Sequence, residues 1–282
     1  MGQIINGKNI AANIKADIKD FVQNREKSNK RLPKIASILV GDDGGSIYYL
    51  NNQEKVATSL GVLFNKIILK ANITENDLIN KIHELNNDNQ IDGIILQLPL
   101  PNHIDEKKVI SEISIEKDID CLTVQSQGKL YMGEKGFLPC TPNSVITLLK
   151  STGITLEGKE TIVLGRSNIV GKPVAQLLLN ENSTVTICHS KTKNLKEVCK
   201  RADILIVAIG KPKFVDDTFI KDGAVVIDVG TSSVEGKITG DVDFDKVIDK
   251  ASYATPVPGG VGALTTTLLI KNACEALKND EN

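Results

Sequence analysis

Two phenols, a run of amides and one lysine occupy the stretch "YYLNNQEKVA" (48–57), which follows the glycine turn "GDDGGS". If this stretch is helical, Tyr49 and Gln53 share a face, because ~100° per residue places position i+4 only ~40° round the axis. Lys55 then lies ~240° round from Tyr49, on another face. Such a helix could hold a flat polar ligand, but Gln53 cannot exchange a proton near neutral pH.

A second polar group leaves a buried strand in "DGIILQLPLP" (92–101), where Gln97 stands at the expected carboxyl end and prolines fix the turn. There Gln97 would point into whatever cleft faces that edge of the sheet. Asp120 follows shortly after, in "KDIDCLT" (117–123). Taken singly, residues of this kind are more often loop caps than site residues.

The stretch "TIVLGRSNIVGKPVAQLLL" (161–179) has the form of a buried strand, a glycine turn and an amphipathic helix. The N-terminus of such a helix would present unpaired N–H groups and a positive dipole end to a phosphate. The spacing of Gly165 and Gly171 is neither G-x-G-x-x-G nor Walker A, and Pro173 after Lys172 excludes a P-loop NTPase. A turn that needs glycines only for close packing is the alternative interpretation.

The end of the next strand indicates which nucleotide is bound. An NAD site expects an acid there to hold the ribose 2′-hydroxyl, but this chain runs out into "CHSKT" (188–192). Arg166 in the preceding turn adds positive charge for a 2′-phosphate, so we expect NADP. Glycines in "AIGKP" (208–212) and "DVGTSS" (228–233) would let the backbone approach the cofactor closely.

Alternating strands and helices must position these groups. Apolar runs predict strands at 34–40, 63–69, 92–98, 160–165, 184–188, 203–210 and 224–230. "TENDLINKIHEL" (74–85) predicts a helix capped by Thr74. Residues 117–142 have few periodic apolar positions and are interpreted as a bridge between domains, followed by a helix over 143–152. The predicted class is α/β, with two doubly wound domains, the second Rossmann-like.

Composition excludes several function classes. The 282 residues suffice for two domains, and 41% hydrophobic with 24% charged residues is typical of a soluble globular protein. A formal net charge of −1 argues against nucleic-acid binding, and no apolar run approaches the ~20 residues that span a membrane. The five cysteines and three histidines are dispersed, so we expect no metal site, no disulfide framework and a cytoplasmic location.

Six motifs follow one another across nearly the whole chain: "GDDGGSIYYLNNQEK", "DGIILQLPLP", "KDID", "GRSNIVGKP", "GDVDF" and "TPVPGGVGALT". In this order they resemble the bifunctional methylenetetrahydrofolate dehydrogenase/methenyltetrahydrofolate cyclohydrolase family of one-carbon metabolism. The resemblance implies two α/β domains around a cleft and a homodimer formed through the nucleotide domain. It implies a folate-binding catalytic domain over 1–120, completed by a C-terminal helix at 263–282, and an NADP-binding domain over 121–262.

The resemblance also assigns roles to residues. Tyr49 would stack on the folate, Gln97 would support the catalytic lysine, and Asp120 would grip the amino edge of the pterin. The residues that would line NADP are Gly165, Arg166, Ser167, Ser190 and Thr231. The loop from Pro256 to Gly262, with Gly259 and Gly260, would lie near the folate. The implied reaction is hydride transfer from 5,10-methylenetetrahydrofolate to the nicotinamide, followed by hydrolysis of the methenyl product to 10-formyltetrahydrofolate.

The chain departs from the family at Gln53, where the family's Tyr-x-x-x-Lys motif has the lysine that assists hydrolysis. We therefore expect a dehydrogenase with weakened cyclohydrolase activity. Full bifunctionality, with Gln53 and an ordered water replacing the lysine, is one alternative. A catalytically silent NADP-binding sensor is another, although a sensor has no need of the pterin grip. A smaller departure is Cys121, which stands where the family has glycine.

Overall fold

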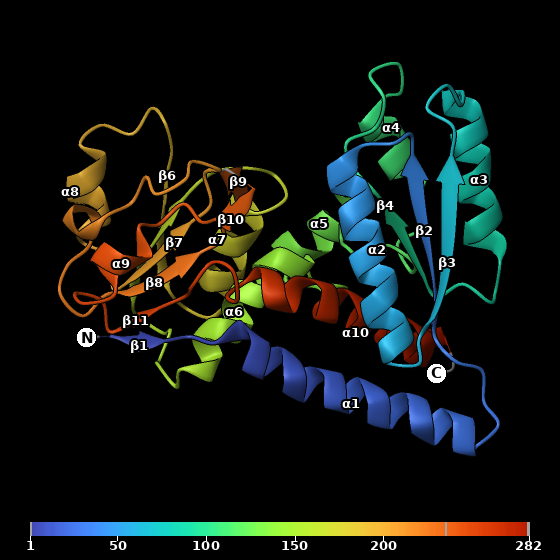
Figure 1. Ribbon diagram of the computed structural model, residues 1–282, viewed down its shortest axis with the longest axis horizontal. Coiled ribbons are helices and arrows are strands. Elements are labelled where there is room, and N and C mark those ends of the chain that lie inside the picture. Colours follow the sequence, from blue (N-terminus) through green and yellow to red (C-terminus); the bar gives the residue numbers. More distant parts are fainter. Residues whose placement is uncertain (1, 235, 281–282) are drawn as a thin grey trace. The chain divides into compact units, whose positions relative to one another are not determined.

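The computed structural model describes residues 2–234 and 236–280, and the chain divides into two compact units (Figure 1). Unit 1 comprises Met1–Ala12 and Pro139–Thr265, and unit 2 comprises Asn13–Leu138 and Thr266–Asn282. One boundary falls between Leu138 and Pro139, and the other two fall inside two long helices, α1 (Gly7–Lys27) and α10 (Gly262–Asp280). Each of these helices therefore contributes turns to both units.

Unit 2 is built on a parallel sheet with the strand order β3–β2–β4. Its strands are β2 (Lys34–Val40), β3 (Leu63–Leu69) and β4 (Gly93–Leu96). The central strand β2 is buried from its second residue to its last, as its continuous apolar run predicts. All three strands lie in the predicted runs, but β4 stops at Leu96, and Pro99 and Pro101 follow in the loop after it.

Different helices cover the two faces of this sheet (Figure 1). The helices of unit 2 are α2 (Gly44–Ser59), α3 (Glu75–Asn87), α4 (Glu106–Ser111) and α5 (Val124–Met132). Leu78 and Ile82 of α3 join Ala36 and Ile38 of β2 in one apolar cluster. Since side chains alternate along a strand, Ser37 lies on the opposite face, the face that α2 covers.

Local capping explains where these helices begin. Thr74 accepts a hydrogen bond from the Asp77 N–H and caps α3, as predicted. Helix α2 begins at Gly44, inside the expected glycine turn, because Asp43 accepts a hydrogen bond from the Ser46 N–H at 2.8 Å. Helix α5 lies in the segment interpreted as an irregular bridge. Thr123 caps its start and Gly133, with φ 69°, ends it.

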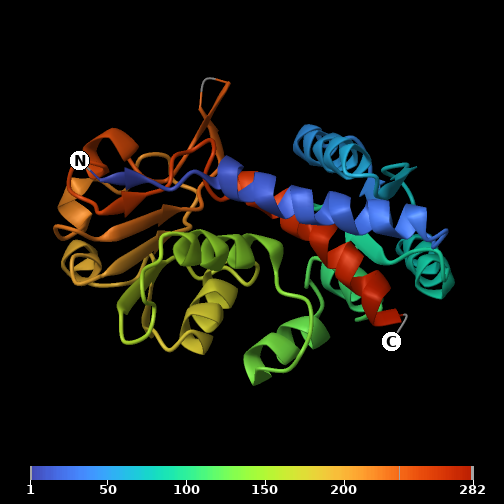
Figure 2. The same cartoon turned by 90° about the horizontal axis from the view of Figure 1, so that it is seen from below.

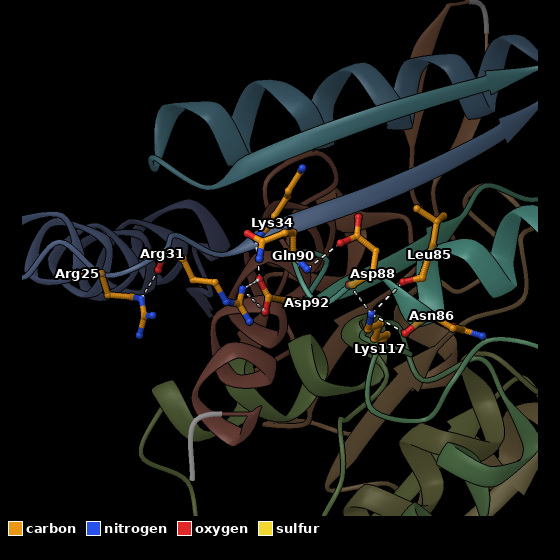
Figure 3. Close-up of polar contacts among 9 residues, drawn as sticks. All are labelled: Arg25, Arg31, Lys34, Leu85, Asn86, Asp88, Gln90, Asp92 and Lys117. Carbon is orange, nitrogen blue, oxygen red and sulfur yellow. Dashed lines mark hydrogen bonds and ion pairs between the residues drawn. The ribbon is translucent and has the colours of Figure 1, made fainter.

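Charged side chains fasten the amino-terminal edge of the unit 2 sheet (Figure 3). The buried carboxylate of Asp92, just before β4, accepts two bonds from Arg31 Nη1, at 2.8 and 2.9 Å, and one from the Lys34 N–H at 2.8 Å. Lys117 Nζ donates to three carbonyl oxygens at the end of α3, those of Leu85, Asn86 and Asp88, each at 2.8 Å. Lys117 therefore caps α3 with a positive charge at its C-terminus.

Unit 1 is built on a larger parallel sheet, whose described strands follow the order β1–β11–β8–β7–β5–β6. Four strands fall inside the predicted runs: β5 (Glu160–Leu164), β6 (Thr184–Cys188), β7 (Ile204–Val207) and β8 (Val225–Asp228). Counted from β5, the sheet has the doubly wound order 2-1-3-4, with its topological switch point between β5 and β7. Ligands bind such sheets at the carboxyl ends of the strands beside this point.

Four short strands of unit 1 were missed by the sequence analysis. They are β1 (Gln3–Ile4), β11 (Tyr253–Ala254) and the antiparallel pair β9 (Ser232–Val234) and β10 (Lys237–Thr239). Two or three residues are too few to show a period of two, so only their partners reveal them.

Helices cover both faces of the unit 1 sheet. Helices α6 (Cys140–Ser151) and α7 (Gly171–Asn180), green and yellow in Figure 2, pack side by side, and α7 also packs on β5 and β6. The other face holds an apolar cluster completed by α8 (Leu195–Cys199), a 3₁₀ helix (Asp217–Phe219) and α9 (Phe244–Val247). Helix α6 begins three residues before the expected start, and its N-cap is Pro139.

We predict that Asp92→Ala lowers the free energy of unfolding by about 2–4 kcal/mol, because it removes three hydrogen bonds to a buried carboxylate. Urea denaturation measures this change. Glu84→Ala is the matched control, since Glu84 is an exposed acid that pairs with Lys81 on the surface of α3. Equal midpoints for the two variants would contradict the assignment of Asp92 as an anchor of the sheet.

Candidate functional site

The loops after β2 and β4 meet at the carboxyl edge of the unit 2 sheet, at the switch point of its 2-1-3 order. Ser46 Oγ, in the first turn of α2, lies 2.8 Å from Asp43 Oδ1 and 3.0 Å from the carbonyl oxygen of Leu98. This contact ties the start of α2 to the loop that follows Gln97. Tyr49 lies one turn further along α2. The residue is 51% exposed, and its ring packs edge-on against that of Tyr48.

A buried chain of polar side chains lies between α2 and this sheet. Gln97 Nε2 donates to Ser37 Oγ at 2.9 Å and to Gln53 Oε1 at 2.7 Å. Gln97 and Gln53 are 6% and 9% exposed, and Ser37 is fully buried. The amide of Gln97 is therefore held by β2 on one side and by α2 on the other. The structure brings Gln53 and Gln97 into direct contact, with Tyr49 one turn from Gln53.

Gln53 and Lys55 lie on different faces of α2. Gln53 is buried and Lys55 is exposed, as helical spacing predicts. An amide can donate and accept hydrogen bonds, but it does not gain or lose a proton at ordinary pH. The Ser37–Gln97–Gln53 chain can thus orient a ligand or a water molecule, and its members cannot act as a general acid or base.

Asp120 is half-buried in a loop that its neighbours hold in place. The carboxylate of Asp118, fully buried, accepts hydrogen bonds from the N–H groups of Leu122 and Thr123, each at 2.9 Å. The Ile94 N–H of β4 donates to the Lys117 carbonyl at 2.8 Å. Cys121 has φ 56°, in the left-handed region that favours glycine, so a strained residue lies beside Asp120.

The two glycines of the turn after β5 are needed because other backbone groups pack closely against them. Gly165 has φ 137°, and a Cβ there would lie 2.2 Å from the Ala208 carbonyl oxygen. A Cβ on Gly171 would lie 2.5 Å from the Gly165 oxygen. The alternative interpretation of these glycines, close packing of the turn, therefore accounts for both positions.

The N-terminus of α7 differs from the expectation of unpaired N–H groups. Ser167 Oγ accepts from the Val170 and Gly171 N–H groups, both at 3.2 Å, and the Ser167 carbonyl accepts from the Lys172 N–H. Pro173 has no N–H to offer. The expectation was wrong because Ser167 caps the helix, so an anion here would meet the helix dipole, the Ser167 hydroxyl and the turn before it.

The end of β6 carries exposed polar groups. Ser190 and Lys191 after β6 are exposed, as is Arg166 in the turn after β5, and the turn after β6 contains no acid. His189 belongs to the turn itself, since its Nδ1 accepts from the Lys191 N–H at 3.1 Å and its N–H donates to Thr192 Oγ1 at 2.9 Å.

The remaining predicted residues lie in loops of unit 1. Thr231 is exposed just after β8. Gly259 has φ 113°, its carbonyl oxygen accepts from the Gly7 N–H at 2.9 Å, and a Cβ on Gly260 would lie 2.7 Å from the Pro256 carbonyl oxygen. This loop is therefore held against the start of α1.

Several residues that shape the site were missed by the sequence analysis. Ser37 and Asp118 are buried polar groups that hold Gln97 and the Asp120 loop. Asp228 and Asp241 are buried at the carboxyl edge of unit 1. A polar residue inside or at the end of an apolar run, as in "IASILV" and "VVIDVG", was the signal that could have found Ser37 and Asp228.

Two negative findings hold for residues 2–234 and 236–280. No group of His, Cys, Asp and Glu side chains in these ranges could hold a metal ion. Within the same ranges, no helix has the length and apolar character needed to cross a membrane.

Comparison with known proteins identifies both parts of the chain. Residues 5–120 match the family model of the tetrahydrofolate dehydrogenase/cyclohydrolase catalytic domain, and residues 139–281 match that of the NAD(P)-binding domain. The bifunctional protein FolD of Clostridium botulinum is 74% identical over 282 residues, which is 100% of both chains.

Solved structures agree in fold over nearly the whole chain. The bifunctional enzyme FolD from Campylobacter jejuni is 41% identical, with a TM-score of 0.97 over 99% of this chain and 100% of that one. The Trypanosoma brucei methylenetetrahydrofolate dehydrogenase-cyclohydrolase, solved with NADP cofactor and inhibitor, is 36% identical, with a TM-score of 0.94 over 100% and 99%. The chain therefore belongs to the tetrahydrofolate dehydrogenase/cyclohydrolase family.

Proposed function

We propose that this chain oxidises 5,10-methylenetetrahydrofolate to 5,10-methenyltetrahydrofolate with NADP and hydrolyses the product only weakly. Both family models match, which supports the folate substrate and the dinucleotide cofactor. The observation that carries the proposal is the buried hydrogen bond between Gln97 and Gln53. It supports a site shaped to hold a ligand, in which the position beside Gln97 has no titratable group.

The residues of unit 1 fit NADP. Arg166, Ser190 and Lys191 offer exposed donors and positive charge to a 2′-phosphate, and no acid competes for it. Gly210 has φ 63° with open space where a Cβ would stand, so the loop after β7 leaves room for a ligand. Gly165, Ser167 and Thr231 would hold the rest of the dinucleotide. When bound, NADP supplies the hydride acceptor.

In unit 2, the half-exposed Tyr49 would stack on the folate through its ring. Asp120 would accept hydrogen bonds from the amino edge of the pterin, held there by Asp118 and Lys117. Pro256, Gly259 and Gly260 would lie along the folate. Oxidation needs the two ligands to be held in close approach, and none of these side chains has to change its protonation state.

Hydrolysis makes a different demand. Opening the methenyl bridge requires that a water lose a proton and that a ring nitrogen gain one. Gln53 can orient the water, but it cannot supply either transfer. We therefore assign Gln53 and Gln97 to positioning, and infer that hydrolysis proceeds close to its rate in solvent.

We further propose that residues 1–120 with the last helix bind folate, that residues 121–262 bind NADP, and that the protein is a cytoplasmic homodimer. The separate matches of the two family models support the division of labour. Light scattering that gave the mass of a single 30.5 kDa chain would contradict the dimer.

The first prediction concerns the missing lysine. Methenyltetrahydrofolate should accumulate during turnover, and Gln53→Lys should accelerate its hydrolysis by about 10²–10⁴-fold. The Gln97 side-chain amide can flip, so that its oxygen accepts hydrogen bonds from the new lysine amine and from the Ser37 hydroxyl. Absorbance of methenyltetrahydrofolate follows both steps. Lys55→Ala is the control on the other face of α2 and should change neither. Hydrolysis by the native protein as fast as oxidation would refute the proposal.

The second prediction concerns the cofactor. NADP should be preferred over NAD by tenfold or more, ~1.4 kcal/mol. Arg166→Ala should raise the KM for NADP and leave that for NAD nearly unchanged. Arg201→Ala is the matched control, because Arg201 pairs with Glu160 at the opposite end of β5. Equal use of both cofactors by the unmutated protein would overturn this assignment.

The third prediction concerns the pterin. Asp120→Ala should weaken folate binding and remove most dehydrogenase activity, since each lost bond to the carboxylate costs about 1.5–3 kcal/mol. NADP binding, measured by calorimetry, should remain intact. Glu116→Ala, which removes an exposed acid from the same segment, should leave both affinities unchanged. Near-normal folate affinity in Asp120→Ala would show that the pterin lies elsewhere.

A further inference from the structure

Two buried carboxyl groups lie at the carboxyl edge of the unit 1 sheet, and the proposed reaction uses neither. Asp228 is the last residue of β8, and Asp241 follows β10. Their exposed fractions are 3% and 0%. Burying an acid is costly unless it is hydrogen-bonded, paired or protonated, so the surroundings of this pair need an account.

The two carboxyls hold three loops together through backbone N–H groups. Asp241 Oδ2 accepts from Ile209 and Gly210, after β7, at 2.7 and 2.8 Å. Asp228 Oδ1 accepts from Gly230, after β8, at 2.9 Å, and from the Asp241 N–H at 3.0 Å. Asp228 Oδ2 accepts from Val242 at 2.9 Å. The loops after β7 and β8 thus take their positions from this acid pair.

Glycines close the space around both carboxyls. A Cβ on Gly230 would lie 2.5 Å from Asp241 Oδ1, and a Cβ on Gly240 would lie 2.0 Å from Asp228 Oδ2. Gly230 is therefore needed for packing against Asp241, a reason that the sequence analysis did not anticipate. Neither carboxyl can move far without shifting a loop.

One carboxyl oxygen of the pair differs from the other three in its hydrogen bonding. Asp241 Oδ1 is buried and has no hydrogen-bond partner among the described residues. Burial, opposed by the three backbone bonds and reinforced by the charge of Asp241, raises the pKa of Asp228 to about 6. Asp241 is the ionisable group that faces Asp228. The other hydrogen-bond partners of its carboxyl among the described residues are backbone N–H groups, and its own backbone N–H donates to the Thr255 hydroxyl at 2.7 Å. Burial beside a second acid disfavours the charged form of Asp228.

We propose that Asp228 keeps a proton beside Asp241, that the two acids position the loops after β7 and β8 for the nucleotide, and that loss of this proton weakens nucleotide binding. This inference rests on the proposed function, in which Thr231 and the Gly210 loop contact NADP. Both acids are positioning residues, since they act through the backbone of these loops.

The pH dependence has a definite sign. The folded protein holds the proton more tightly than the unfolded chain, in which an Asp has a pKa of 3.8. The resulting stabilisation is complete below that value and is lost as the pH rises through about 6. Above this pH Asp228 becomes charged in a buried site beside a second acid, so the loops above it hold the nucleotide less well.

Asp241→Asn tests the proposal, because asparagine resembles the protonated acid and keeps an oxygen for the N–H groups of Ile209 and Gly210. NADP affinities are measured by calorimetry between pH 5.5 and 8, and each variant is compared with the unmutated protein at the same pH. This comparison cancels titration of the 2′-phosphate itself. The variant should match the unmutated protein at pH 5.5 and bind about threefold to tenfold more tightly at pH 8.

Asp243→Asn is the matched control. Asp243 lies in the same segment, but it pairs with Lys246 at 3.0 Å and with Lys213 at 3.9 Å, and no loop N–H depends on its carboxylate. Its NADP affinity should follow that of the unmutated protein at every pH. Weaker NADP binding by Asp241→Asn throughout the range, or a pH dependence identical to that of the unmutated protein, would overturn the proposal.

Infrared spectroscopy of the unmutated protein supplies a readout that does not depend on NADP. A C=O stretching band of a protonated carboxyl should disappear as the pH rises through about 6. Its absence would refute the proton on Asp228. If the band is present and the protein binds no NADP at any pH, the acid pair stands and the proposed function fails.

Discussion

Two amide side chains buried between a helix and a sheet cost free energy unless they bond to each other or to the backbone. In unit 2 this constraint is met by Gln97, which donates to both Ser37 and Gln53. The placement of α2 over the sheet follows from it, because moving the helix would leave buried amide atoms without partners. Tyr49 takes its position from the same helix. The site is thus set by a polar contact that is also part of the core.

The strands could be predicted because apolar runs form them, whether the run is buried almost throughout, as in β2, or partly exposed, as in β3 and β6. β2, β3 and β6 match the predicted runs end for end, while β4, β7 and β8 are shorter because their last residues leave the ladder to form loops. α5 was missed because its apolar residues are few, although Thr123 and Gly133 mark its two ends. β1 and β11 could not be found, since each consists of two residues defined only by their neighbours.

The residues of the candidate site also fall into those that the sequence could predict and those that it could not. Helical spacing was enough to separate Gln53 from Lys55, and the end of an apolar run was enough to place Gln97 at the carboxyl edge. The partners of the acids could not be read in this way. Asp228 and Asp241 are 13 residues apart, and Asp241 bonds to N–H groups more than 30 residues before it. Every residue except proline has the same backbone N–H group, so a sequence does not show which of these groups bonds to which carboxylate. Only the fold shows it.

The buried polar groups of the two units differ in their chemistry and in their role. In unit 2 the buried chain consists of neutral groups, so its geometry is the same at any ordinary pH, as suits a reaction that needs only alignment. In unit 1 the buried groups are acids, whose charge varies with pH, and they hold loops through the backbone. A lysine in place of Gln53 would bring a titratable group into the first of these environments. The amide of Gln53 offers alignment without proton transfer, and the proposed weak hydrolysis with retained oxidation rests on this difference.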